Sequence, residues 1–206
     1  MTEQDDEGVC LGYPGLPDFS IGFYRAPDRV PRPHRMHLDV YAGPARDELV
    51  QTALAAGAVH LDIGQHDVPW VVLADPEDYA FCVMPDRDEY VNTGPIGGIP
   101  IDSDDIPAAN AFWQEAFNWV LNDDGHFRHP SGRGPLIAFT EPEGPKVGKN
   151  PMHLDIRVPP GGDYEAEIER LLGLGASRLD HDWGELNWTV LVDPGNNEFC
   201  LLKPLA

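Results

Sequence analysis

Two short stretches of the chain alternate polar and apolar residues in the same order. They read MHLDV at 36–40 and MHLDI at 152–156. Successive side chains of an extended strand point to opposite faces, so each stretch predicts a strand with one apolar and one polar face. The polar faces are candidate ligand-binding surfaces, and their other interpretation is a hydrogen-bonded polar wall. They carry His37 and Asp39 in the first stretch, and His153, Asp155 and Arg157 in the second.

Each of these strands begins a longer repeat. The first is followed by LVQTALAAGAVHLD and WVVLADPEDYAFCVM, and the second by IERLLGLGASRLD and WTVLVDPGNNEFCLL. In the second copy, Asp163 is a good N-cap for a helix with apolar residues at helical spacing, and Gly175 lies near its end. The DPGNN segment at 193–197 predicts a hairpin turn. Each copy therefore predicts a strand, a helix and a meander of three strands, which is a βαβββ unit.

Residues 96–150 follow the same plan. IGGIPID predicts a strand, and Asp105 is the N-cap of a helix that presents an apolar stripe with Phe112, Trp113 and Phe117. LIAFTEP then predicts a late strand. Residues 1–33 differ, because they offer two strands, VCLGY and FSIGFY, without a helix.

We therefore expect an α+β fold of paired βαβββ modules, arranged as two tandem domains. The first domain, 9–85, lacks its first strand and helix. Residues 86–94 are polar and rich in turn formers, and we expect them to be the linker between domains. The second domain, 95–206, is complete.

The charge of the chain restricts its partners. The formal net charge is −21, and only 14 residues are Lys or Arg. Phosphate contacts need basic side chains, so this charge argues against nucleic acid and anionic membranes. It is consistent with solubility alone, and also with a preference for a cationic ligand. No apolar run reaches the length of a membrane span, and the three cysteines match no zinc motif, so we expect a reduced, cytoplasmic protein.

Paired units that carry HLDIRV, LLGLGASRLD and WTVLVDPGNNEFCLL resemble the vicinal oxygen chelate superfamily. This superfamily includes glyoxalase I, bleomycin-resistance proteins and extradiol dioxygenases, and the sequence is most similar to its glyoxalase-like branch. The resemblance implies that two βαβββ units form a cup of eight strands around a ligand cavity, with helices packed outside. It implies one complete cup from 95–206 and a trimmed cup from 9–85.

Enzymes of this superfamily hold a divalent metal with a residue early in the first strand, and another in the last strand, of each unit. In the second domain these positions fall at Gly98, at Phe139 or Thr140, and at His153 and Cys200, with Glu198 two residues before Cys200. A catalytic metal needs about three protein ligands and an open position. We therefore expect no cofactor, and the alternative is a divalent metal held by His153 and Glu198.

The trimmed domain offers fewer metal ligands still. His37 matches His153, but Ala80 stands where Glu198 does, which leaves Cys82 as the second donor.

Four residues have a functional and a structural interpretation. Glu198 is the candidate general base, and its other interpretation is a solvated residue after the turn. Cys200 is a nucleophile only beside a base that lowers its pKa, and is otherwise a small buried residue. Trp70 and Trp188 begin inner strands, where they either stack on a flat ligand or pack in the core.

We expect the chain to bind a small organic ligand, polar or cationic, in its strand-lined cups. It is then a binding or sequestering protein, or an enzyme that needs no metal. The alternative is a divalent-metal-dependent lyase, isomerase or dioxygenase of the superfamily. The sheet edge left open by the trimmed domain predicts a homodimer. The ligand-binding candidates are His153, Asp155, Arg157, Trp188, Cys200, His37, Asp39 and Trp70, and the catalytic candidate is Glu198.

Overall fold

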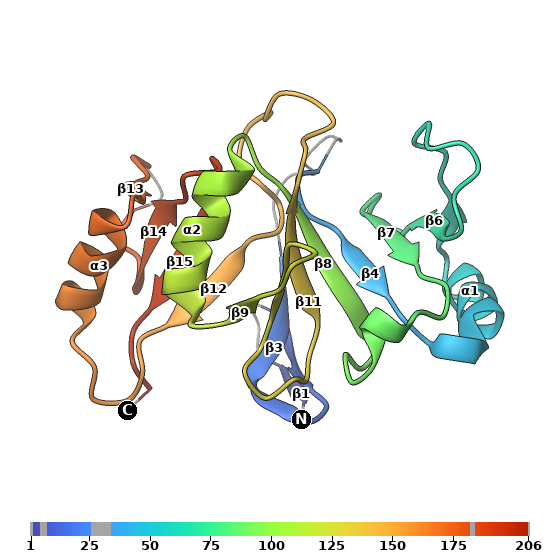
Figure 1. Ribbon diagram of the computed structural model, residues 1–206, viewed down its shortest axis with the longest axis horizontal. Helices are drawn as coiled ribbons and strands as arrows, with labels where there is room; N and C mark the ends of the chain where they lie inside the picture. Colours follow the sequence, from blue (N-terminus) through green and yellow to red (C-terminus); the bar gives the residue numbers. More distant parts are fainter. Residues whose placement is uncertain (1, 5–7, 26–33, 182–183, 206) are drawn as a thin grey trace.

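The computed structural model describes residues 2–4, 8–25, 34–181 and 184–205, whose strands form three sheets (Figure 1). The N-terminal sheet has the strand order β1-β2-β3. Its strands are β1 (Thr2–Gln4), β2 (Gly8–Tyr13) and β3 (Leu16–Tyr24). The two strands predicted in this segment are therefore confirmed, and a short first strand joins them.

The largest sheet has eight strands. Its bounds are β4 (Leu38–Val40), β5 (Val59–His60), β6 (Val71–Ala74), β7 (Ala80–Val83), β8 (Ile96–Asp102), β9 (Val120–Leu121), β10 (His126–Arg128) and β11 (Leu136–Thr140). Their order is β5-β6-β7-β4-β8-β11-β10-β9. The third sheet has the order β12-β15-β14-β13, with β12 (Leu154–Arg157), β13 (Ser177–Arg178), β14 (Trp188–Val192) and β15 (Glu198–Leu202).

Three helices complete three βαβββ units. They are α1 (Arg46–Ala55) after β4, α2 (Ile106–Phe117) after β8 and α3 (Tyr164–Gly173) after β12. Asp105 and Asp163 are the predicted N-caps, and each side chain accepts a hydrogen bond from a backbone N–H of the first turn. In each unit the first strand is parallel to the last one. The expected α+β fold of βαβββ units and cupped mixed sheets is confirmed.

The pairing of the units differs from the expected one. The sequence analysis takes all eight strands of the complete cup from 95–206, whereas the eight-stranded sheet combines the unit at 38–83 with the unit at 96–140. The two first strands, β4 and β8, meet edge to edge in antiparallel orientation. Among the described residues, β12 pairs with β15 alone. The domain boundaries themselves stay a prediction.

The segment predicted as a linker is packed into the fold. It contains a short 3₁₀ helix, η2 (Asp88–Tyr90), and the side chains of Tyr90 and Thr93 are buried. The Tyr13 hydroxyl donates to the Thr93 carbonyl over 2.7 Å, which ties this segment to the N-terminal sheet. Residues 86–94 are therefore a packed connection between β7 and β8.

The α-helices cover one face of the eight-stranded sheet. The opposite face, here named the open face, carries no α-helix among the described residues, and Cys82, Met84, Tyr90 and Leu136 are buried on it. Apolar residues under α1, such as Leu73 and Val83, alternate along their strands with Val72 and Cys82, which point the other way. Figure 1 shows α2 between the eight-stranded and four-stranded sheets, with α1 and α3 at opposite ends of the molecule. The Trp113 ring of α2 accordingly contacts aromatic rings from β11 and β15.

The apolar stripe predicted on α2 is core. Phe112 and Trp113 are each 1% exposed, and the Trp113 indole N–H donates to the Asp193 carboxylate over 2.7 Å. No helix of the described residues is long and apolar enough to cross a membrane.

Candidate functional site

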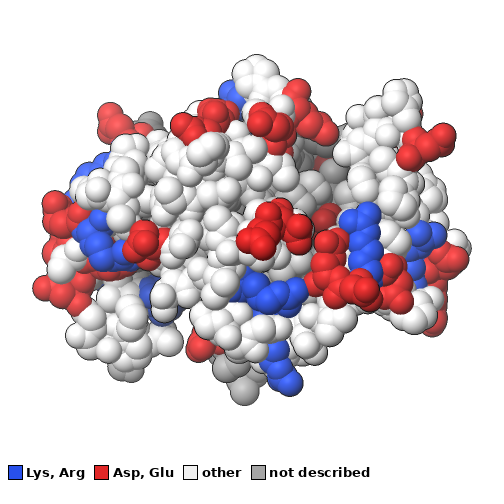
Figure 2. Space-filling view, in the orientation of Figure 1, with Lys and Arg blue, Asp and Glu red and all other residues white. Residues whose placement is uncertain are grey.

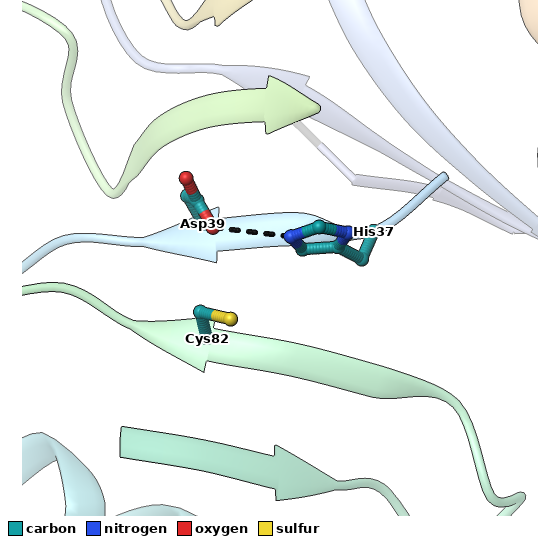
Figure 3. Close-up of side chains that lie close together, drawn as sticks. All are labelled: His37, Asp39 and Cys82. Atoms are coloured by element: carbon teal, nitrogen blue, oxygen red, sulfur yellow. Dashed lines mark ion pairs between the residues drawn. The ribbon is translucent and has the colours of Figure 1, made fainter. Parts of the chain in front are cut away.

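The open face of the eight-stranded sheet carries three polar side chains in contact. Asp39 of β4 lies opposite Cys82 of the parallel strand β7, and His37 precedes Asp39 by two residues on the same face (Figure 3). The His37 Nε2 atom is 3.5 Å from an Asp39 carboxylate oxygen. One donor atom from each of the three residues lies within 4.8 Å of the others.

The third βαβββ unit repeats this cluster. Asp155 of β12 lies opposite Cys200 of β15, and the His153 Nε2 atom is 3.2 Å from an Asp155 carboxylate oxygen. The donor atoms of His153, Asp155 and Cys200 also lie within 4.8 Å of one another. The structure therefore brings together five of the predicted ligand-binding residues, and adds Cys82 to them.

Both cysteines are poor nucleophiles in this setting. Burial raises the pKa of the Cys82 thiol to about 12, and the charge of Asp39 and a hydrogen bond with it act in the same direction. Burial likewise raises the pKa of Cys200 to about 12, with a smaller contribution from Asp155 and an opposing one from Lys149. Both thiols are therefore protonated at neutral pH.

The first cluster lies in apolar surroundings. The same face buries Cys82, Met84, Tyr90 and Leu136, and partly buries Tyr41, Trp70 and Val72. The rings of Tyr41 and Tyr90 are 5.1 Å apart. This face is thus an aromatic and aliphatic surface around the Asp39 carboxylate.

Gly98 lies directly beside that carboxylate. It is the partner of Asp39 across the β4–β8 junction. A Cβ atom built on Gly98 would lie 3.5 Å from the outer carboxylate oxygen of Asp39. The Gly98 backbone therefore borders Asp39 with no side chain between them, and a Cβ at this position would lie in van der Waals contact with the carboxylate.

Asp39 has no permanent cation as a partner. Its side chain is 12% exposed, and among the described residues the ion pair it makes is with His37. A buried carboxylate is normally paired with a cation or fully hydrogen-bonded. Glu198 shows the contrast, because its 5% exposed side chain meets the Lys146 ammonium at 2.7 Å.

The second cluster is more open than the first. The Asp155 side chain is 40% exposed, since no described strand lies along the outer edge of β12. Trp188 on β14 shares the face of Cys200 and is 41% exposed. Arg157 is exposed, and its guanidinium donates to the Lys203 carbonyl over 2.7 Å.

Glu198 does not join this second cluster. It shares a face of β15 with Cys200, but its carboxylate is turned to Lys146 and to the backbone N–H of Asn150. The alternative metal pair of His153 and Glu198 stays a prediction, and the donors that lie close to His153 are those of Asp155 and Cys200. A general-base role for Glu198 stays a prediction.

The sequence analysis missed two kinds of residue. Tyr41 follows Asp39 by two residues, so the alternation already places it on the same face. Tyr90 and Leu136 carry no such signal, because the packing of the connection and the β4–β8 junction bring them there. Asp39 and Asp155 are donors that the family metal positions do not include, so the resemblance did not predict them.

Paired βαβββ units with cupped sheets, and polar clusters on their open faces, define the class of protein. The family model of the glyoxalase-like domain matches residues 2–84 and 98–202, which is most of the chain. The chain belongs to this family, within the vicinal oxygen chelate superfamily.

The similar solved structures agree with this class. The structure of glyoxalase I from Zea mays is similar over 95% of this chain and 78% of that one, with 15% identity and a TM-score of 0.61. A mutant form of glyoxalase I from Zea mays gives a TM-score of 0.63 at 15% identity, over 98% of this chain and 82% of that one. At this identity the likeness concerns the fold alone. No curated protein matches the chain by sequence.

Proposed function

We propose that the open face of the eight-stranded sheet binds a small organic cation that has an apolar or aromatic part. The observation that carries the proposal is Asp39, a nearly buried carboxylate without a Lys or Arg partner among the described residues. An ammonium group on a ligand would supply the missing charge, because charge-assisted hydrogen bonds are strongest where water is excluded. His37 would orient the same carboxylate.

The surroundings of Asp39 suit such a ligand. Tyr41, Tyr90 and Trp70 offer aromatic surface, and aromatic faces attract cations. Arg87 already lies 5.9 Å from the centre of the Trp70 ring. The net charge of −21 adds a long-range attraction for cations. Figure 2 shows a group of acidic side chains over the half of the molecule that β4, β7 and α1 occupy in Figure 1.

The test uses benzylamine, a primary ammonium on an aromatic ring, with benzoate as the anion of similar shape. Isothermal titration at neutral pH is expected to detect benzylamine binding to the wild type and no benzoate binding. Asp39→Asn removes the charge and keeps the shape, so binding is expected to weaken at least tenfold. Asp155→Asn changes the same motif in the other unit and is the matched control. Equal affinity in Asp39→Asn and the wild type would refute the proposal.

The second candidate is a divalent-metal-dependent lyase, isomerase or dioxygenase. The observation that favours it is the gathering of His, Asp and Cys donors in two units. An imidazole nitrogen, a carboxylate oxygen and a cysteine sulfur that loses its proton on metal binding fit a zinc-like ion, which would polarise an oxygen pair on a substrate. Elemental analysis of protein purified without chelator tests this candidate. A stoichiometric metal that is lost in His153→Ala would support it, and metal-free active protein would exclude it.

A further inference from the structure

One cation of the protein already lies against the open face, the guanidinium of Arg87. Its central carbon is 5.9 Å from the centre of the Trp70 ring, which is within the range of a cation–π contact. One of its nitrogen atoms lies 3.1 Å from a carboxylate oxygen of Glu89. The side chains of Arg87 and Glu89 are each 36% exposed, so water reaches both groups. An aromatic ring and a carboxylate therefore hold this guanidinium together.

The Trp70 ring is held in place by contacts other than the one with Arg87. It belongs to the apolar cluster of the open face, together with Tyr90. Its indole N–H donates to the side-chain amide oxygen of Gln65 over 2.9 Å. The Arg46 guanidinium donates to the carbonyl of Pro69, directly before Trp70, over 2.9 Å. The ring is therefore a surface that another cation is able to use in place of the guanidinium.

Tyr90 connects this contact with Asp39. Burial raises the pKa of the Tyr90 hydroxyl, the charges of Asp39 and Glu89 raise it further, and the charge of Arg87 lowers it. Asp39 and Arg87 thus act on the same side chain. Among the described residues, however, the ion-pair partner of Asp39 is His37 and that of Arg87 is Glu89. The neighbourhood of Tyr90 therefore contains two carboxylates, and a cation of the protein is paired with only one of them.

We propose that Arg87 determines the charge of the ligand, because it fills one of two cation positions on the open face. The position beside Asp39 is left to a ligand with a single positive charge. A second ammonium group that approached Trp70 and Glu89 would meet the guanidinium there, and like charges repel each other most strongly where water is scarce. The inference rests on the proposed function, since it concerns the same face, and it names the ligand class as an organic monocation.

Two amines of equal chain length test this inference. Hexylamine carries one ammonium group, and hexamethylenediamine carries two on a flexible chain that spans a range of distances. Isothermal titration of the full chain gives a Kd for each amine, and the measured quantity is the ratio of the two. In Arg87→Ala the second ammonium gains the Trp70 ring and the Glu89 carboxylate. The ratio is therefore expected to shift about three- to thirtyfold in favour of the diamine, relative to the wild type.

Three further variants separate this role from a general effect of charge. Arg87→Lys keeps a cation at this position and is expected to keep the wild-type ratio. Arg178→Ala is the matched control, because it also removes an exposed arginine that faces a carboxylate, Glu169 at 3.7 Å, but in the third unit. It is expected to leave the ratio unchanged. Adding Glu89→Gln to Arg87→Ala removes the vacated carboxylate and is expected to reduce the gain of the diamine.

The outcomes distinguish this inference from the proposed function. Circular dichroism of each variant establishes that the fold is intact. A wild-type ratio in folded Arg87→Ala would overturn the role of Arg87, and hexylamine binding that weakens in Asp39→Asn would still support the proposed function. Equal hexylamine affinity in Asp39→Asn and the wild type would refute both.

Discussion

Gly98 provides the sharpest perturbation of the proposed ligand site, because a side chain there reaches the ligand and disturbs little else. A Cβ on Gly98 would lie 3.5 Å from the Asp39 carboxylate oxygen and 3.7 Å from the Leu136 carbonyl oxygen. These are ordinary van der Waals distances, so the strand accepts Gly98→Ala. Glycine in a strand interior is less stable than alanine by about 0.5–1 kcal/mol, so the free energy of unfolding is expected to stay equal or rise.

Binding is expected to change in the opposite direction. The added methyl group occupies space from which a ligand ammonium would approach Asp39. A lost hydrogen bond to a charged group costs about 1.5–3 kcal/mol. Since 1.4 kcal/mol corresponds to a factor of ten, the Kd for benzylamine is expected to rise about 10- to 100-fold in Gly98→Ala.

The assay combines urea unfolding with isothermal titration of benzylamine. The control is Gly173→Ala at the end of α3, where a Cβ would meet no atom within 4 Å. This control is expected to bind benzylamine like the wild type. Unchanged affinity in a stable Gly98→Ala variant would refute the placement of the ligand beside Asp39.

Three further predictions concern the fold and assembly. Burial raises the pKa of Cys82 and Cys200 from 9.0 to about 12. Because the thiols of the unfolded chain then ionise at lower pH than those of the folded chain, the free energy of unfolding is expected to fall as the pH rises above about 9. Urea unfolding at pH 8 and pH 10 checks this, and the variant with both cysteines replaced by serine is expected to lose the pH dependence that these thiols contribute. Trp113→Phe removes the indole N–H that donates to the buried Asp193 carboxylate. It is expected to lower the free energy of unfolding by about 1–3 kcal/mol in the same assay, and a urea midpoint equal to that of the wild type would contradict this. The outer edge of β12 lacks a described partner strand, and Phe23 is 55% exposed, so we expect a homodimer by light scattering, and a monomer would contradict this.

The units of the fold could be predicted from the sequence, but their pairing could not. Alternation in MHLDV and MHLDI, and the N-caps Asp105 and Asp163, define local structure, which depends on neighbouring residues. The pairing of β4 with β8 depends instead on tertiary packing, which decides which two free strand edges lie side by side. The sequence repeat indicates that the first strand of each unit has a free edge. It does not indicate which other strand pairs with that edge.

The candidate site, too, could be predicted where it depends on local strand geometry and not where it depends on tertiary packing. The shared face of His37 and Asp39 is a consequence of strand geometry and could be predicted. The position of Cys82 beside Asp39 depends on the register of two parallel strands that are far apart in sequence. The apolar surroundings of Asp39 come from Tyr90 and Leu136, which are supplied by the connection and by the neighbouring unit. No local pattern contains that information.

A crystal structure of the protein soaked with benzylamine tests the central claim most directly. We expect density for one benzylamine on the open face of the eight-stranded sheet, with its ammonium group beside Asp39 and its position bordered by Gly98. Density for benzylamine only elsewhere on the molecule, away from Asp39 and Gly98, would contradict the account.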